Sequence, residues 1–189
     1  MIVVSRGIGG IVAQRCRRSA HLIANGVPLP DRSSNTDHLD RLGVQPSRRY
    51  ILAVARFVPE KGLHDLVEAF TALKGDVQLV IAGDADHETD VYEGLPIALL
   101  EAMSYGLSVL VSDIPANMEV ELPAHRYFRC GNVTDLGEKM ASLLKRQMAV
   151  QEKEALRVRI AAHYDWRRIA GQTVAVYEEA LGACTWVRE

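Results

Sequence analysis

Two short stretches of the sequence combine charged side chains with predicted helix starts, an arrangement suited to an extended anionic ligand. In residues 56–62, RFVPEKG, Arg56 ends an apolar run and Lys61 follows a few residues later at the mouth of a predicted helix. Open α/β sheets bind ligands beyond the carboxyl ends of their strands, and a helix N-terminus attracts anions. A guanidinium and an ammonium placed there predict a diphosphate clamp. Without other context, an Arg and a Lys in a solvated surface turn explain such a pair more often.

The second stretch is residues 93–101, EGLPIALLE, which has a glutamate at each end. If both were helical, Glu93 and Glu101 would lie roughly 12 Å apart along the axis, whereas the paired carboxylates of a glycoside hydrolase lie roughly 5–9.5 Å apart. The spacing suits two parts of one extended ligand, such as a ribose diol and a second group of hydroxyls. Gly94 lets the backbone approach that ligand and leaves amides free at the helix start. Taken alone, a loop glutamate and a solvated helix glutamate are the commoner explanation.

Strands and helices alternate around these two stretches. Nearly unbroken apolar runs at Tyr50–Ala55 and Val77–Ala82 are typical of strands buried on both faces, and Ser108–Val111 predicts a third strand. Helical periodicity predicts three inner faces, namely Leu63, Leu66, Val67 and Phe70; Leu95, Leu99, Ala102 and Met103; and Leu136, Met140, Leu143 and Leu144. Pro96 and Gly106 suit the start and end of the second helix. The alternation predicts an α/β fold with a Rossmann-like, mostly parallel sheet flanked by helices.

The two ends of the chain carry shorter elements. We expect strands at Met1–Val4, His21–Val27 and Arg126–Phe128, a helix at Gly7–Arg18, and a polar connecting segment at Pro28–Pro46 with a short helix at Asp37–Leu42. Thr134 is the predicted cap of the third helix, and the charged residues 145–159 continue or restart it. Asp165 is the predicted cap of a last helix. Its expected inner face is Trp166, Ile169, Thr173, Val176 and Tyr177.

Composition excludes several classes of protein. A net charge of −2 gives no electrostatic basis for binding nucleic acid. Cys16, Cys130 and Cys184 form no C-x-x-C pair, and the six histidines are scattered, so we expect neither a disulfide framework nor a metal site. No apolar run approaches the ~20 residues of a transmembrane helix. A cytoplasmic location is predicted, and a peripheral contact at the inner membrane face is left open.

Two further patterns are weak. The glycines of residues 7–10 follow an apolar run as in a dinucleotide-binding loop, but Val12 occupies the third glycine position and no acidic residue follows at the expected spacing. Asp84 and Asp86 form a D-x-D, which binds metal in other transferase folds, but a polar turn at a strand end is the favoured interpretation.

The two charged stretches occur in the order seen in one enzyme family. Residues 53–62 resemble the phosphate-binding segment of family 4 glycosyltransferases (group 1), and residues 93–106 resemble their E-x7-E segment. Segments 80–84 and 109–113, together with residues 3–5 and 25–27 near the start, match in order. The chain is therefore similar to the C-terminal, donor-binding domain of a retaining enzyme with the GT-B fold.

This resemblance implies a role for each candidate residue. Arg56 and Lys61 would bind the donor diphosphate and stabilise it as it leaves, Glu101 would hold the ribose, and Glu93 would face the donor sugar. Backbone amides around Gly94, Leu95 and Pro96 would touch sugar or phosphate. Arg56, Lys61 and Glu93 would thus form the catalytic set. The donor would be a UDP- or GDP-type nucleotide-sugar, no metal or other cofactor is expected, and the acceptor would be a glycan or glycolipid.

The sequence departs from the family in two places. The acceptor-binding N-terminal domain is missing, so residues 1–49 are interpreted as a remnant of the interdomain hinge and a connecting segment, 50–162 as the donor-binding domain, and 163–189 as a C-terminal helix. Only ten residues separate Gly83 from Glu93, where the family has about two more strands' worth of chain. We therefore expect an internal deletion, a direct crossover from the Val77–Ala82 strand to Ser108–Val111, and a rearranged site around Glu93.

Three functions remain open at this stage. The leading hypothesis is the donor-binding domain of a glycosyltransferase, inactive alone because it lacks an acceptor site. The second is a non-catalytic nucleotide or nucleotide-sugar binding module that pairs with a separate N-terminal subunit. The third is a degenerate fragment that binds no ligand.

Overall fold

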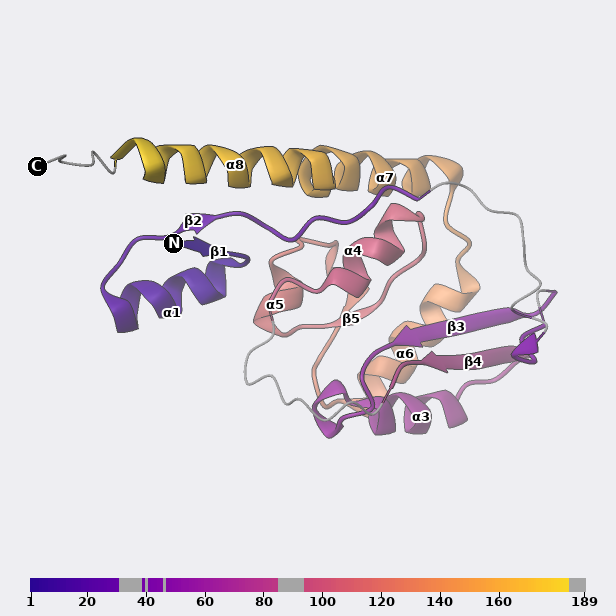
Figure 1. Ribbon diagram of the computed structural model, residues 1–189. Helices are drawn as coiled ribbons and strands as arrows, with labels where there is room; N and C mark the ends of the chain where they lie inside the picture. Colours follow the sequence, from indigo (N-terminus) through magenta and orange to yellow (C-terminus); the bar gives the residue numbers. More distant parts are fainter. Residues whose placement is uncertain (31–38, 40, 46, 85–93, 184–189) are drawn as a thin grey trace, which may run out of the picture.

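The computed structural model describes residues 1–30, 39, 41–45, 47–84 and 94–183 (Figure 1). Its strands form three parallel pairs: β1 (Ile2–Val3) with β2 (His21–Leu22), β3 (Arg49–Val54) with β4 (Val77–Ala82), and β5 (Val111–Ser112) with β6 (Tyr127–Phe128). The helices are α1 (Arg6–Cys16), α3 (Leu63–Thr71), α4 (Ile97–Ser104), α5 (Pro115–Met118), α6 (Val133–Lys145), α7 (Val150–Tyr164) and α8 (Trp166–Ala183), with 3-10 turns η1 (Pro59–Lys61) and η2 (Ala124–Arg126). The predicted α/β class, with parallel strands flanked by helices, is confirmed, but the described strands form three short sheets rather than one.

The β3–β4 ladder is the longest of the three pairs. It runs in register from Arg49 opposite Val77 to Val54 opposite Ala82. The prediction that β3 is buried on both faces is wrong, because alternate side chains, Tyr50, Leu52 and Val54, are exposed. Within the described part of the chain no element covers that face, whereas Ile51 on the opposite face packs against a buried cluster.

The expected crossover from β4 to the next strand is also wrong. Among the described residues β4 pairs only with β3, and β5 pairs with β6, so the two ladders are separate sheets. The third strand begins at Val111 rather than Ser108. Figure 1 shows β5 beneath α4, apart from the β3–β4 pair.

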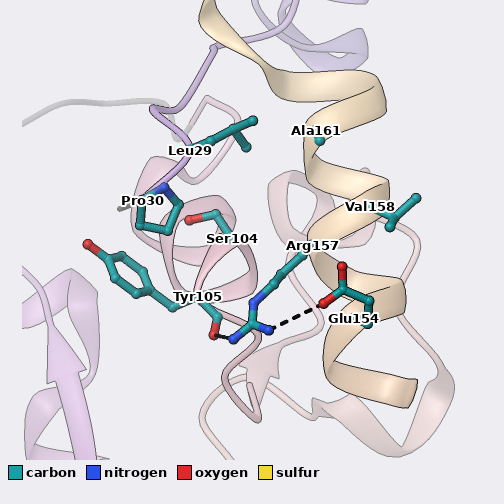
Figure 2. Close-up of a pocket in the computed structure, with 8 residues that line it drawn as sticks. All are labelled: Leu29, Pro30, Ser104, Tyr105, Glu154, Arg157, Val158 and Ala161. Carbon is teal, nitrogen blue, oxygen red and sulfur yellow. Dashed lines mark hydrogen bonds and ion pairs between the residues drawn. The ribbon is translucent and has the colours of Figure 1, made fainter. Parts of the chain in front are cut away.

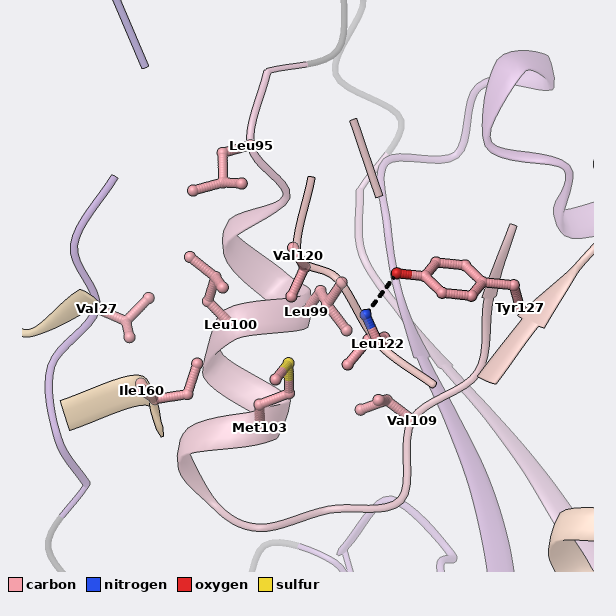
Figure 3. Close-up of a cluster of buried hydrophobic side chains, with 10 residues drawn as sticks. All are labelled: Val27, Leu95, Leu99, Leu100, Met103, Val109, Val120, Leu122, Tyr127 and Ile160. Carbon is pink, nitrogen blue, oxygen red and sulfur yellow. Dashed lines mark hydrogen bonds between the residues drawn. The ribbon is translucent and has the colours of Figure 1, made fainter. Parts of the chain in front are cut away.

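Two hydrophobic clusters hold the elements together. The larger, the α4 cluster, comprises Val27, Leu95, Leu99, Leu100, Met103, Val109, Val120, Leu122, Tyr127 and Ile160, and joins α4 to α7 (Figure 3). The smaller, the α3 cluster, is built on Ala69, Leu136 and Met140 and joins α3 to α6. Because adjacent strand residues point to opposite faces, the β5–β6 ladder serves both: Tyr127 enters the α4 cluster, and Phe128 packs against the α3 cluster.

Side-chain caps begin three of the helices. The Ser5 hydroxyl accepts the Ile8 N–H at 3.2 Å, and Asp165 accepts the N–H groups of Arg167 and Arg168, as predicted for the last helix. The predicted cap of α6 is wrong by two positions: Asn132, not Thr134, accepts an N–H, that of Asp135, at 2.9 Å. Asn caps a helix at least as well as Thr, and α6 begins at Val133, directly after Asn132.

The predicted inner faces of α4 and α6 are confirmed, and those of α3 and α8 are confirmed only in part. The face of α4 includes Leu100 in addition to the expected residues. In α3, Ala69 is buried while Val67 is 45% exposed, so the inner face is rotated from the predicted one. In α8, Ile169 is buried, but Trp166 and Tyr177 are exposed.

The remaining boundaries differ by a few residues. The predicted strand at His21–Val27 is limited to β2, and Val27 forms an isolated parallel bridge with Asp165. The segment after α6 restarts as the separate helix α7, and α1 closes at Arg17, whose φ is +50°. The short helix expected at 37–42 falls largely outside the described residues.

Replacing Tyr127 by phenylalanine tests how the shared ladder is fixed. The buried Tyr127 hydroxyl accepts the Leu122 N–H at 2.7 Å and donates to the Asn117 carbonyl at 3.4 Å. Removing it leaves a buried N–H unpaired, so Tyr127→Phe should lower the free energy of unfolding by about 1–3 kcal/mol in urea denaturation. The same change at the exposed Tyr177 is the control and should leave stability within error. Equal midpoints for both variants would contradict this account.

Candidate functional site

Arg56 lies two residues after the end of β3. Hydrogen bonds between the two chain segments continue beyond the strands: the Ala55 N–H donates to the Ala82 carbonyl at 3.1 Å, and the Phe57 N–H donates to the Asp84 carbonyl at 2.7 Å. Arg56, half-buried, stands between these two bonds at the carboxyl end of β3. This is the position that the sequence predicted, at the edge where open α/β sheets bind ligands.

Lys61 ends the short turn η1 that follows Arg56. Gly62 then adopts a left-handed conformation, with φ of +63°, and its N–H donates to the Pro59 carbonyl at 3.0 Å. A residue with a Cβ is strained there, so the glycine allows the chain to turn directly into α3 at Leu63. Lys61 is half-buried and stands beside the first turn of that helix, as predicted.

Gly83 makes this strand-end geometry possible. A Cβ built on Gly83 would lie 1.8 Å from the Ala55 carbonyl oxygen and 2.9 Å from its carbonyl carbon, so no side chain fits. Ala55 and Gly83 come this close just before the hydrogen bond between the Phe57 N–H and the Asp84 carbonyl. The placement of Arg56 therefore depends on a glycine on the neighbouring strand.

The second group of candidate residues is carried by the start of α4. Leu95 is only 6% exposed and anchors the segment in the α4 cluster (Figure 3), while Gly94 and Pro96 are half-buried. Pro96 caps α4 in an extended conformation and its carbonyl accepts the Leu100 N–H at 3.2 Å. Proline has no N–H, so the first free amide that α4 itself offers a ligand belongs to Ile97.

Glu101 points away from the core. It is exposed, whereas its neighbours Leu100 and Met103 are fully buried. Within the described part of the chain its carboxylate makes no hydrogen bond or ion pair, whereas its backbone carbonyl accepts the Ser104 hydroxyl at 2.7 Å and the Tyr105 N–H at 3.2 Å. An ionised carboxylate in this state can accept two hydrogen bonds from a diol.

The structure thus assembles the candidate residues in two groups. Arg56 and Lys61 lie between β3 and α3, and α3 packs on α6. The second group, Gly94, Leu95, Pro96 and Glu101, lies at the start of α4 and on it, and α4 packs on α7. Figure 1 shows α3, into which η1 leads, apart from α4. Glu93 lies outside the described residues, so the rearrangement expected around it stays a prediction.

Two hollows elsewhere contain none of the predicted residues. One of about 250 Å³ lies between the end of α4 and α7 (Figure 2), where Arg157 donates to the Tyr105 carbonyl at 2.9 Å and pairs with Glu154 at 3.4 Å. The other, of about 530 Å³, is more polar and is lined by residues of α1, α7 and α8, including Arg6, Arg159 and Arg168. Arg6 pairs there with Glu121 at 3.3 Å, and Arg159 is bound to backbone carbonyls.

The structure also brings Asn25 to the second group, which sequence reasoning missed. Its side-chain amide donates to the Leu95 carbonyl at 3.3 Å, although the two residues are 70 positions apart. In the sequence, Asn25 stands out only as part of residues 25–27, which match the family in order, and no local pattern links it to Leu95.

Metal and membrane features are not found in the described residues. No group of three or more His, Cys, Asp or Glu side chains gathers there at metal-binding range. None of the described helices is both long and apolar enough to span a bilayer. Cys16 and Cys130 are free and exposed.

Comparison with known proteins gives a family match and several relatives. The profile of "Glycosyl transferases group 1" matches residues 34–91 and 87–162. An MMP alpha-(1->4)-mannosyltransferase of Mycolicibacterium hassiacum is 28% identical over 132 residues, covering 67% of this chain and 32% of that protein. A phosphatidyl-myo-inositol mannosyltransferase of Mycobacterium tuberculosis is 27% identical over 215 aligned positions, covering 85% of this chain and 54% of that protein. The chain thus spans about a third to a half of these curated relatives.

Solved structures agree on the fold. HepE of Anabaena in complex with UDP-glucose superposes with a TM-score of 0.80 at 16% identity, covering 94% of this chain and 63% of that one. Sucrose-phosphate synthase of Thermosynechococcus elongatus superposes with a TM-score of 0.76 at 18% identity, covering 96% of this chain and 58% of that one. At these identities the likeness concerns the fold alone, and it confirms the expected similarity to GT-B glycosyltransferases.

Substituting Gly83 tests the close approach that positions Arg56. A Cβ in Gly83→Ala would meet backbone, which cannot move aside as a side chain can, so the free energy of unfolding should fall by at least about 1–3 kcal/mol. The matched control is Gly171→Ala in α8, where nothing lies within 4 Å of the new Cβ and stability should hold or rise by up to about 1 kcal/mol. Urea midpoints measure both, and a Gly83→Ala midpoint equal to wild type would show that the strand ends are not held as described.

Proposed function

The chain belongs to the group 1 glycosyl transferases, and we propose that it forms the donor-binding half of such an enzyme, holding a nucleotide-sugar for transfer to an acceptor. The observation that carries this proposal is the placement of Arg56 just after the carboxyl end of β3 and of Lys61 just before the first turn of α3. Two cations beside a helix start suit a diphosphate. Support also comes from HepE of Anabaena, whose structure was determined in complex with UDP-glucose.

Each candidate residue has a proposed role in holding the donor. Arg56 and Lys61 would bind the diphosphate, and Glu101, exposed and without a described partner, would accept hydrogen bonds from the ribose hydroxyls. The backbone around Gly94 to Pro96 would contact the sugar, and Glu93 would face it. The donor would be of the UDP or GDP type, and no metal is required.

The proposed contribution to catalysis is electrostatic. When the bond between the sugar's anomeric carbon and the phosphate oxygen breaks, negative charge accumulates on the departing nucleoside diphosphate. Preorganised cations aimed at that charge lower the barrier more than they stabilise the bound donor. Arg56 and Lys61 would supply this stabilisation, and we propose transfer with retention at the anomeric carbon.

The acceptor side of the reaction is proposed on the relatives alone. The two curated relatives are mannosyltransferases, so a glycan or glycolipid acceptor and a cytoplasmic site at the inner face of a membrane are consistent with the family. Transfer needs the acceptor hydroxyl positioned beside the donor. This chain spans about a third to a half of those relatives, so the proposal for it is limited to binding of the donor.

The pattern of matches supports an internal deletion as the origin of the short connection. The two family matches meet at residues 87–91, between β4 and α4, instead of forming one continuous match. The alignment to the mycobacterial enzyme extends over 215 positions, more than the 189 residues of this chain. A relative with additional residues between β4 and α4 would produce both observations.

A non-catalytic nucleotide-binding module is the second candidate. It is favoured by the separation of the candidate residues into two groups. The group after β3 rests on the α3 cluster, and the group at the start of α4 rests on the α4 cluster; we call these two parts of the fold its packing units. Such a module would bind the nucleoside diphosphate through Arg56 and Lys61 without distinguishing the attached sugar. Comparing the affinities for a nucleoside diphosphate and its sugar derivative separates the two candidates.

Thermal unfolding with nucleotides tests the proposed donor site. With UDP, GDP, ADP or a matching nucleotide-sugar at 100 times its dissociation constant, the protein should gain about 2.7 kcal/mol of stability. Arg56→Ala and Glu101→Ala should lose that gain. Lys74→Ala and Glu138→Ala, which change exposed residues outside both groups, are matched controls and should retain it.

Two outcomes of that experiment contradict the proposal. A cooperative transition that no nucleotide shifts would mean a folded protein without a working donor site. A broad, non-cooperative transition would favour the degenerate fragment, because such a chain has no single folded state for a ligand to stabilise.

A further inference from the structure

The N-terminal segment of the chain contacts the loop that leads into α4. Asn25, half-buried after β2, donates its side-chain N–H to the Leu95 carbonyl at 3.3 Å. The Leu95 side chain is buried in the α4 cluster, as Figure 3 shows above the first turn of α4. Leu95 is therefore held at two points, by packing of its side chain and by the hydrogen bond to its carbonyl.

A second contact restricts the same loop at Gly94. A Cβ built on Gly94 would lie 3.3 Å from Val4 Cγ2 and 3.8 Å from Ile8 Cδ1, so the beginning of α1 packs directly on the glycine backbone. Ser5, between these two residues, is buried and caps α1. The loop thus lies against the start of α1 at Gly94 and against Asn25 at Leu95.

Asn25 itself is firmly anchored. The next residue, Gly26, is packed so tightly that a Cβ would lie 2.9 Å from the Trp166 ring. Val27 is fully buried, and its N–H donates to the Tyr164 carbonyl at 2.8 Å. The backbone after Asn25 is therefore fixed on the junction of α7 and α8, which gives the Asn25 amide a rigid base.

The start of α1 is tied to the body of the protein as well. The Glu119 carboxylate, which follows α5, accepts the Arg6 N–H at 2.7 Å and the Gly7 N–H at 2.9 Å. A carboxylate at a helix N-terminus pairs with unsatisfied amides and with the positive end of the helix dipole. Both surfaces that flank the Gly94–Leu95 loop are thereby held in place by long-range contacts.

We infer that Asn25 is a positioning residue for the sugar end of the donor site. The bond to the Leu95 carbonyl orients the peptide plane between Leu95 and Pro96, and together with the buried Leu95 side chain it restricts how the chain enters α4. The inference rests on the proposed function, in which this loop contacts the donor sugar while Arg56 and Lys61 hold the diphosphate. Asn25 acts through Leu95 and is not required to touch the ligand.

This role predicts a selective effect on binding. Asn25→Asp keeps the size of the side chain but replaces the donating amide by a carboxylate that faces the Leu95 carbonyl. Loss of one hydrogen bond to a partly buried carbonyl should weaken binding of a nucleotide-sugar by about tenfold. The affinity for the corresponding nucleoside diphosphate should stay the same, because its two proposed cations follow β3.

The experiment is isothermal titration of the full chain with UDP and UDP-glucose, and with GDP and GDP-mannose. Asn132→Asp is the matched control: Asn132 acts as an acceptor in capping α6, a role that Asp retains, so both affinities should equal those of wild type. Asn25→Gln keeps an amide donor on a longer side chain. This variant should recover part of the affinity for the nucleotide-sugar. If Asn25→Asp does not unfold cooperatively in urea, Asn25→Gln becomes the test variant, and it should show a smaller loss of affinity that is again confined to the nucleotide-sugar.

The outcomes separate this inference from the function on which it rests. A loss confined to the nucleotide-sugar, with partial recovery in Asn25→Gln, would support positioning. Equal losses for both ligands, or none for either, would overturn it and leave the donor site intact as a proposal. Absence of binding by the wild-type chain to any of the four ligands would overturn the proposed function and this inference together.

Discussion

The short parallel ladder between β5 and β6 is the feature on which the rest of the structure depends. Because successive residues point to opposite faces, Tyr127 completes the α4 cluster and Phe128 packs on the α3 cluster. The buried Tyr127 hydroxyl, bonded to the Leu122 N–H, fixes the strand against the chain that follows α5. Arg126, just before β6, is buried with its guanidinium donating to the Val109 carbonyl at 3.3 Å, and burial lowers its pKa from the ordinary value.

This arrangement explains why the candidate site is divided. The β3 ladder and α3 rest on one cluster, whereas α4 rests on the other, so the proposed diphosphate and sugar contacts stand on separate packing units. The exposed face of β3 lies on the first of these units. On the second unit, which is built on α4, the N-terminal segment packs against the loop before α4 through Asn25 and the start of α1. Residues 1–30 are therefore part of the packing of the site rather than an appendage to it.

Much of the site could be predicted because its signals are local. Arg56 and Lys61 are identified by a strand that ends and a helix that begins within a few residues, and both places are confirmed. The face of α4 follows from its 3.6-residue period. The errors have a different cause: burial of β3 on both faces, pairing of β4 with the third strand and the rotated face of α3 all depend on which element lies opposite. Periodicity states that a face is apolar, but not what covers it.

The sequence by itself determined the order and type of the elements, the family, and the residue types available for binding, because propensity, periodicity and short motifs act over a few neighbouring positions. Tertiary structure alone decided which strands pair, which clusters form, and that Asn25 meets Leu95 and Glu119 meets the start of α1. These contacts join residues 70 and 113 positions apart, so they exist only once the chain has packed. Their energies come from burial and hydrogen bonding between elements, which no local stretch of sequence records.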